Sequence, residues 1–109
     1  MCMDSLAESL SSDEIETVRR ALKATVEGSF FPDWEFETLI GVERDIVKKV
    51  YEAWPRQTVD QDVFSCAVIG SMNNLIGYPH RKEDEFAFYV PEGRAAIDGA
   101  SKHLTSLGV

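Results

Sequence analysis

Hydrophobic residues recur at helical spacing along most of this chain. The first such stretch follows Ser11, where four apolar side chains lie three or four residues apart, at Ile15, Val18, Leu22 and Val26. This spacing predicts an amphipathic helix. Ser11 and Glu14 have the spacing of a capping box, in which each side chain accepts a hydrogen bond from the other residue's backbone N–H, so we expect the helix to begin near Ser11. Gly28 suits the left-handed residue that follows a helix end.

A short helix and a second long helix are predicted next. Asp33 is expected to cap a helix that runs to about Ile40, and Gly41 ends it. Residues 42–54 form the second long helix, because their apolar side chains make one broad stripe: Val42, Ile46, Val47, Val50, Tyr51 and Trp54. Pro55 ends it. Four aromatic residues lie between positions 30 and 36. We expect them to fill the core, with a binding surface as the alternative.

Residues 63–76 form the most apolar stretch of the chain. Their side chains are apolar on nearly every side of a helix, which is typical of a central helix, and we expect Cys66 to be buried within it. Residues 86–90 alternate as a strand does, but the run is also short enough for a helical turn. Pro91 suits the first turn of a last helix, which Gly108 ends.

Together these segments predict an all-α fold, a single compact domain of four to five helices around one buried central helix, with residues 86–90 as the one candidate extended segment. A chain of 109 residues has the size of one domain. Its 44% of hydrophobic residues can form a core, which argues against disorder. We assign residues 11–109 to the helical domain and residues 1–10 to a frayed N-terminus.

The chain is acidic, and its acidity is uneven. The net charge is −8, from 19 acidic and 11 basic residues. Residues 1–62 hold 14 acids and 7 bases, whereas residues 63–109 hold 5 acids and 4 bases. Nucleic-acid-binding proteins neutralise phosphates with Lys and Arg, so no nucleic-acid partner is expected. An acidic face attracts a basic protein partner, although surface acids also serve solubility alone.

Cysteine usage and the N-terminus indicate a cytoplasmic protein. Cys2 and Cys66 make no disulfide framework, which favours a reducing compartment. Residues 1–12 contain Asp4 and Glu8 and no continuous apolar run, so we expect no signal peptide. The apolar stretch 63–76 is too short and too polar to cross a bilayer, so no membrane partner is expected either. Both a monomer and a homodimer fit the sequence.

The sequence holds no motif typical of catalysis, of a cofactor site or of a metal site. His80 is followed by Glu83, Asp84 and Glu85, but this spacing matches no recognised metal site. A reactive cysteine needs an accessible, electropositive setting, which the apolar run around Cys66 does not offer. We therefore expect no enzyme activity, no cofactor and no metal. A small enzyme that uses His80 and neighbouring acids is one alternative.

A transcription-associated protein is a second alternative. Residues 36–54 resemble the short helix, glycine turn and long helix of a helix-turn-helix motif. A recognition helix is expected to be clearly basic. Here three basic and three acidic residues cancel, namely Arg44, Lys48 and Lys49 against Glu43, Asp45 and Glu52.

Two motifs together resemble a group of small, uncharacterised bacterial proteins with a single cytoplasmic domain. They are GSFFPDWEFETLIGVER at residues 28–44, with Trp54-Pro55 closing the following helix, and NNLIGYPH at residues 73–80. Some proteins of this general kind are immunity proteins, which neutralise toxins delivered between competing bacteria, as in contact-dependent growth inhibition. The resemblance implies an immunity-like inhibitor whose protein partner is a toxin domain, such as a basic nuclease.

The candidate partner-binding residues are mainly acids of the first half, because an acidic protein blocks a basic cleft well. They are Glu27, Asp33, Glu35, Glu37, Glu43 and Asp45, with Trp34 as an aromatic anchor. Helix-start placement and solubility are the alternative explanation for each acid. Tyr78 and His80 are further candidates in the second motif. That motif also fits a structural corner, in which Asn73 and Asn74 hydrogen-bond to unpaired helix carbonyls.

Overall fold

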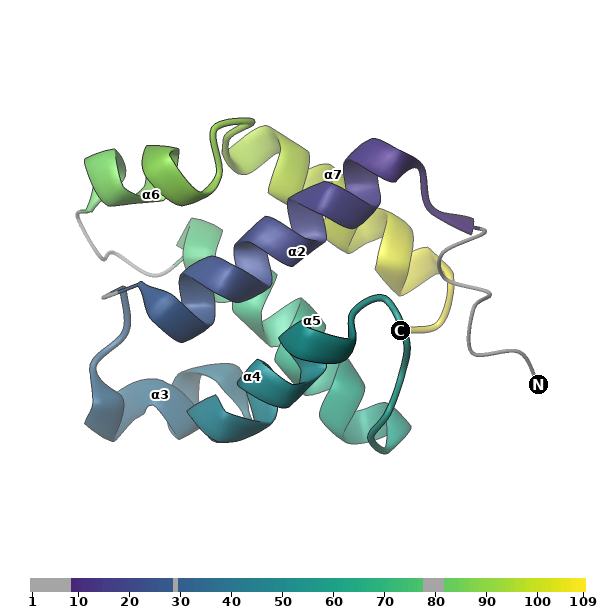
Figure 1. Cartoon of the computed structure of the whole chain (residues 1–109), viewed down its shortest axis with the longest axis horizontal. Helices are drawn as coiled ribbons and strands as arrows, with labels where there is room; N and C mark the ends of the chain where they lie inside the picture. Colours follow the sequence, from purple (N-terminus) through teal and green to yellow (C-terminus); the bar gives the residue numbers. More distant parts are fainter. Residues whose placement is uncertain (1–8, 29, 78–81) are drawn as a thin grey trace.

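The computed structural model describes residues 9–28, 30–77 and 82–109, and these residues form six helices and no strand (Figure 1). The helices are α2 (Ser12–Glu27), α3 (Asp33–Ile40), α4 (Arg44–Ala53), α5 (Gln61–Gly77), α6 (Glu83–Tyr89) and α7 (Arg94–Ser106). The all-α prediction is confirmed. There are more helices than the four to five we predicted, because residues 86–89 of the ambiguous segment belong to helix α6 and Val90 follows its end. None of the described helices is long and apolar enough to cross a membrane.

Two crossing helices share the centre of the molecule, where we predicted one. Helix α5 contacts α2, α3, α4 and α7, and α2 contacts α4, α5, α6 and α7. The two helices cross near the middle of Figure 1. Helix α5 buries Phe64, Val68 and Met72, but Cys66 is exposed, which contradicts the predicted burial. Asn73, two turns further along the same side, is exposed as well, and its Oδ1 accepts a hydrogen bond from the Ser101 hydroxyl of α7 at 3.2 Å.

Helix α2 begins as predicted and ends differently. The Ser11 hydroxyl accepts a hydrogen bond from the Glu14 backbone N–H at 3.1 Å, and a Glu14 carboxylate oxygen accepts one from the Ser11 N–H at 3.0 Å. The capping box is therefore confirmed. Gly28 is extended, with φ −77°, so the predicted left-handed conformation is wrong. A glycine fits there because a Cβ would lie 2.5 Å from the Phe30 ring.

Helix α3 is held against α5 by close backbone packing and by one amide. Gly41, after the end of α3, is left-handed with φ 103°, as suits a glycine. A Cβ on Gly70 of α5 would lie 2.5 Å from the Ile40 carbonyl oxygen, so the two backbones approach closely. The Asn74 amide donates hydrogen bonds of 2.8 Å to the carbonyls of Leu39 and Gly70. Asn74 thus satisfies an unpaired helix carbonyl, as we predicted.

The aromatic residues around position 33 divide between core and surface. Phe30, Phe31 and Phe36 are buried, as predicted, and the rings of Phe31 and Phe36 meet edge to face with centroids 6.2 Å apart. Trp34 is instead 82% exposed, because it points away from the core in the first turn of α3. The prediction that all four fill the core is therefore wrong for Trp34.

Two predicted helix boundaries move inward. The second long helix, predicted over residues 42–54, is α4 and spans Arg44–Ala53. The last helix begins at Arg94 and not at Pro91, because a turn at residues 91–92 and Gly93, with a positive φ of 89°, precede it. At the other end of the chain, Leu10 is buried in the core, and residues 1–8 of the terminal segment lie outside the described residues.

Candidate partner-binding surface

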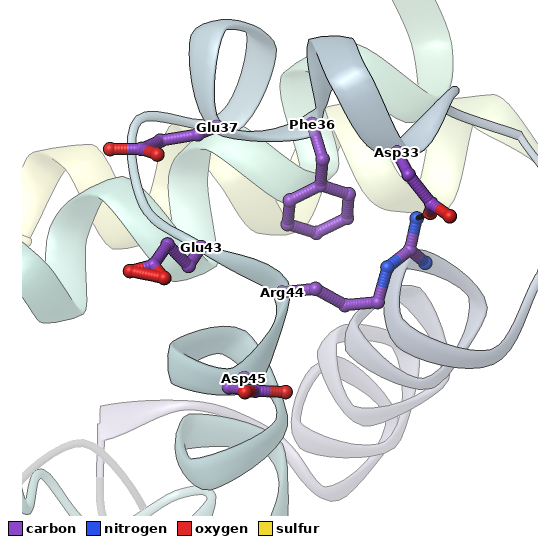
Figure 2. A pocket seen from close by; sticks show the side chains of 6 residues that line it. All are labelled: Asp33, Phe36, Glu37, Glu43, Arg44 and Asp45. Atoms are coloured by element: carbon purple, nitrogen blue, oxygen red, sulfur yellow. Dashed lines mark hydrogen bonds and ion pairs between the residues drawn. The ribbon is translucent and has the colours of Figure 1, made fainter.

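Four of the predicted acidic residues surround one open hollow between α3 and α4. Its volume is about 500 Å³. It is lined by Asp33, Phe36, Glu37, Glu43, Arg44 and Asp45, and we call it the acidic hollow. Figure 2 shows the Phe36 ring and the Arg44 side chain between Asp33 on one side and Glu37 and Glu43 on the other. The structure thus brings together residues that the sequence separates by up to a dozen positions.

The local sequence explains this convergence. Gly41 turns the chain sharply between the two helices, so the end of α3 lies beside the start of α4. Asp33 and Asp45 occupy the first turns of α3 and α4, where a carboxylate favours the positive end of the helix dipole. The predicted cap at Asp33 is wrong. Asp33 is the first residue of α3 and makes no side-chain capping bond, because its carboxylate pairs with Arg44 instead.

Arg44 forms the floor of the acidic hollow, a role that the sequence analysis missed. Its guanidinium donates to the carbonyl oxygens of Thr25 and Val26 at 3.2 and 3.1 Å and to that of Phe31 at 3.3 Å. It also pairs with Asp33 at 2.8 Å. Thr25 and Val26 lie in the last turn of α2, whose carbonyls have no partner within the helix. Arg44 therefore ties the end of α2 to the start of α4.

The Arg44 guanidinium also lies over the Phe36 ring, 4.4 Å from its centroid. A cation over an aromatic face is attracted by the negative charge of that face, so the buried ring and the arginine hold each other in place. Arg44 is a single arginine at the end of an acid-rich, aromatic stretch of sequence. This was the one signal in the sequence that could have predicted an ion pair between Arg44 and a nearby acid. The backbone carbonyls that Arg44 contacts could not be read from that signal.

The other three acids of the hollow do not join separate helices as Asp33 does through Arg44. Among the described residues, Glu37, Glu43 and Asp45 make no ion pair, and all three are exposed. Arg44 is directed to the backbone and to Asp33, so it neutralises only part of the surrounding charge. The hollow therefore presents a net negative surface to solvent.

Trp34 extends this surface along α3. It follows Asp33 in the chain, and the Asp33 side chain is 94% exposed even while it pairs with Arg44. A single exposed apolar side chain is ordinary on a protein surface. An exposed tryptophan on the helix that also carries Asp33 and Glu37 of the acidic hollow is a combination suited to binding, because tryptophan dominates many protein interfaces.

The remaining predicted site residues lie elsewhere. Glu27 is exposed at the end of α2 and does not line the acidic hollow. Glu35 is half-buried in α3 and does not line it either. Tyr78 and His80 lie outside the described residues, as does any pairing of His80 with Cys66. Within the described ranges, no three His, Cys, Asp or Glu side chains gather in a way that could hold a metal ion.

The carboxylates with shifted pKa values are also outside the hollow. The pKa of Glu14 is lowered by its hydrogen bond from the Ser11 backbone and by His103, whose Nδ1 lies 2.9 Å from a Glu14 oxygen. Burial alone raises the pKa of Glu92. Hydrogen bonds from its own backbone, Thr17 and Arg20 outweigh that effect, so the pKa of Glu92 is lowered overall. These two carboxylates serve the fold.

Comparisons with known proteins add no further constraint on this surface. No protein-family model, curated protein or solved structure matches the chain.

Proposed function

We propose that this protein binds a basic protein partner through the acidic hollow and Trp34. The observation that carries the proposal is the position of Glu37, Glu43 and Asp45, which surround one hollow and form no ion pair with the described residues. Fold-stabilising carboxylates elsewhere in the molecule have cationic or hydroxyl partners, such as those of Glu92. Carboxylates that lack such partners remain available to a cationic ligand.

Charge and shape would have separate roles in this binding. The negative hollow attracts a positively charged domain over several ångströms and speeds their encounter. Trp34 then supplies the apolar contact, and loss of a central tryptophan from an interface typically weakens binding by about 2 kcal/mol or more.

The surface is also preorganised. Arg44 joins α2, α3 and α4 through its hydrogen bonds, and Asn74 joins the end of α3 to α5. A rigid binding surface loses little conformational entropy when its partner docks. This rigidity favours an inhibitor that binds a folded domain tightly.

The partner class we propose is a toxin domain, which makes the protein an immunity-like inhibitor. The support is the resemblance of residues 28–44 and 73–80 to a group of small bacterial proteins, a general kind that includes some immunity proteins, together with the negative charge of the hollow. A basic nuclease suits such a surface, because its cleft binds phosphates and is blocked by an array of carboxylates.

Coexpression with the toxin domain encoded by a neighbouring gene tests this function. The wild-type protein should restore growth and bind the toxin domain in isothermal titration calorimetry. The triple variant Glu37→Gln, Glu43→Gln, Asp45→Asn should bind at least about tenfold more weakly, because interfacial charge pairs contribute on the order of 1.5 kcal/mol or more each.

A matched triple variant controls for net charge. Glu52→Gln, Asp62→Asn, Asp84→Asn removes the same number of negative charges from exposed positions outside the hollow, and it should bind almost as well as the wild type. Equal weakening by both triple variants would show that only net charge matters and would contradict a specific site. A non-cognate basic protein should not bind.

A further inference from the structure

A second hollow lies on the other side of α2 and has the opposite chemistry. It is lined mainly by three cations of α2 and three aromatic side chains of α4 and α6, and its volume is about 290 Å³. These residues are Arg19, Arg20, Lys23, Tyr51, Phe88 and Tyr89; Glu16 and Pro91 complete the lining, and we call this surface the basic hollow. A site with cations beside exposed aromatic rings suits a ligand that carries both carboxylates and a large apolar group.

The charge of the basic hollow is only partly neutralised by the protein itself. Glu16 lies 3.6 Å from Arg19 and 3.7 Å from Arg20, and Glu92 lies 2.9 Å from Arg20. Lys23 is exposed and makes no ion pair with the described residues. Three cations thus face two nearby carboxylates, which leaves a positive surface on a chain whose net charge is −8.

Phe88 gives this hollow a large apolar side chain that is mostly exposed to solvent. Helix α6 buries Phe86 on its inner side, and Phe88, two residues further on, faces outward with 79% of its surface exposed. Its ring lies edge to face against Tyr89, with centroids 5.2 Å apart. Phe88 and Trp34 are the two most exposed large hydrophobic side chains among the described residues.

The first turn of α3 carries the chemistry that the basic hollow lacks. There the exposed Trp34 follows Asp33, whose side chain is 94% exposed, and the exposed Glu37 comes three residues later. We propose that the basic hollow of one molecule receives Trp34 and its neighbouring carboxylates from a second copy of this chain. The indole would pack against Phe88, and the carboxylates would approach Arg19 and Lys23. This self-association does not depend on the proposed toxin partner, although both would use Trp34.

The net negative charge of each copy does not prevent this contact. At physiological ionic strength the screening length is about 8 Å, so charges far from the contact repel weakly while those within it attract. Because the two surfaces differ, the contact is head to tail, and a pair of copies keeps one free surface of each kind. Association should therefore continue beyond a dimer, into a ring or a short chain.

Sedimentation of the purified protein from micromolar to millimolar concentration tests this proposal. The average mass of the wild type should rise with concentration past that of a dimer, and high salt should reduce it. Trp34→Ala and Phe88→Ala should each weaken association at least about tenfold, as expected for loss of an aromatic anchor. Both side chains are exposed, so thermal denaturation should show unchanged melting temperatures.

A mixture of the two variants tests most directly whether the two surfaces bind each other. Phe88→Ala keeps Trp34, and Trp34→Ala keeps the basic hollow, so an equimolar mixture should form a discrete heterodimer although neither variant associates alone. The proposal would be overturned if the wild type stayed monomeric. It would also be overturned if the wild type associated but the mixture of the two variants stayed monomeric. Phe88→Ala should still bind the toxin domain, so a failure of self-association is distinguishable from a failure of the proposed function.

Discussion

Carboxylates are used in two ways in this molecule. Near the contacts of α2 with α6 and α7, carboxylates link segments that are far apart in the chain. The Glu92 carboxylate accepts hydrogen bonds from the Thr17 hydroxyl and the Arg20 guanidinium at 2.8 and 2.9 Å. A Glu14 carboxylate oxygen lies 2.9 Å from Nδ1 of His103. Around the acidic hollow, Asp33 alone has such a partner among the described residues, namely Arg44. Both regions contain acids at or near helix starts, so helix-start placement does not distinguish them. The two regions differ in whether a cation or a hydroxyl from a distant segment of the chain pairs with the carboxylate.

This difference also refines the uneven distribution of charge along the sequence. The acidic half of the chain contains both kinds of carboxylate, since Glu14 belongs to it as much as Glu37 does. A face available to a partner is therefore a property of a few residues in α3 and α4 and not of the whole first half. The following changes test this comparison.

Removal of Arg44 should have the largest effect on stability. Arg44→Ala leaves the last-turn carbonyls of α2 without their donor and leaves Asp33 without its cation. We expect a loss of about 3 kcal/mol in the free energy of unfolding, measured with urea, because charged hydrogen bonds contribute about 1.5–3 kcal/mol and unsatisfied groups add to the cost. Lys48→Ala, at an exposed position of α4, is the control and should change it by less than about 0.5 kcal/mol. Similar small effects for both variants would show that Arg44 is not structural.

Acid should destabilise the region of paired carboxylates. The pKa values of Glu92 and Glu14 are lowered in the folded state, so both groups stabilise the protein above the ordinary glutamate pKa of about 4.3. That stability is lost as the pH falls through their lowered pKa values. Melting temperatures measured from pH 7 to pH 3 should therefore fall, and Glu92→Gln should flatten the decline while it lowers stability at pH 7. Glu43→Gln is the matched control. If it flattened the decline as much as Glu92→Gln, the distinction between the two regions would fail.

Neutralising the acidic hollow should have the smallest effect on stability. The triple variant Glu37→Gln, Glu43→Gln, Asp45→Asn removes no ion pair with a described residue and loses only the favourable position of Asp45 at the start of α4, so its free energy of unfolding should stay within about 1 kcal/mol of the wild type. The free energy of unfolding is measured by urea denaturation, on the same protein preparation that is used for the binding measurements. A large loss would mean that these acids serve the fold, and weakened toxin binding could then not be assigned to a surface.

The local features of this protein could be predicted from sequence. The helices follow from apolar residues at helical spacing, and the capping box of Ser11 and Glu14 lies within one helical turn. The amide of Asn74 was expected to satisfy a helix carbonyl, and it does. The acidity of residues 27–45 was also visible, because charge is a property of composition. These features depend on residues only a few positions apart, or on residue type alone.

Only the tertiary structure decided which of these features form a surface. Cys66 and Trp34 were expected in the core and are exposed, because burial depends on which neighbouring helix covers each side. Asp33 was expected to cap α3, but an arginine eleven positions later takes its carboxylate. The acidic hollow needs Gly41 to bring α3 beside α4, and the basic hollow joins residues of α2, α4 and α6. The sequence thus determined the helices and their charge. The long-range packing determined which side chains face solvent together, since that depends on contacts between segments far apart in the chain.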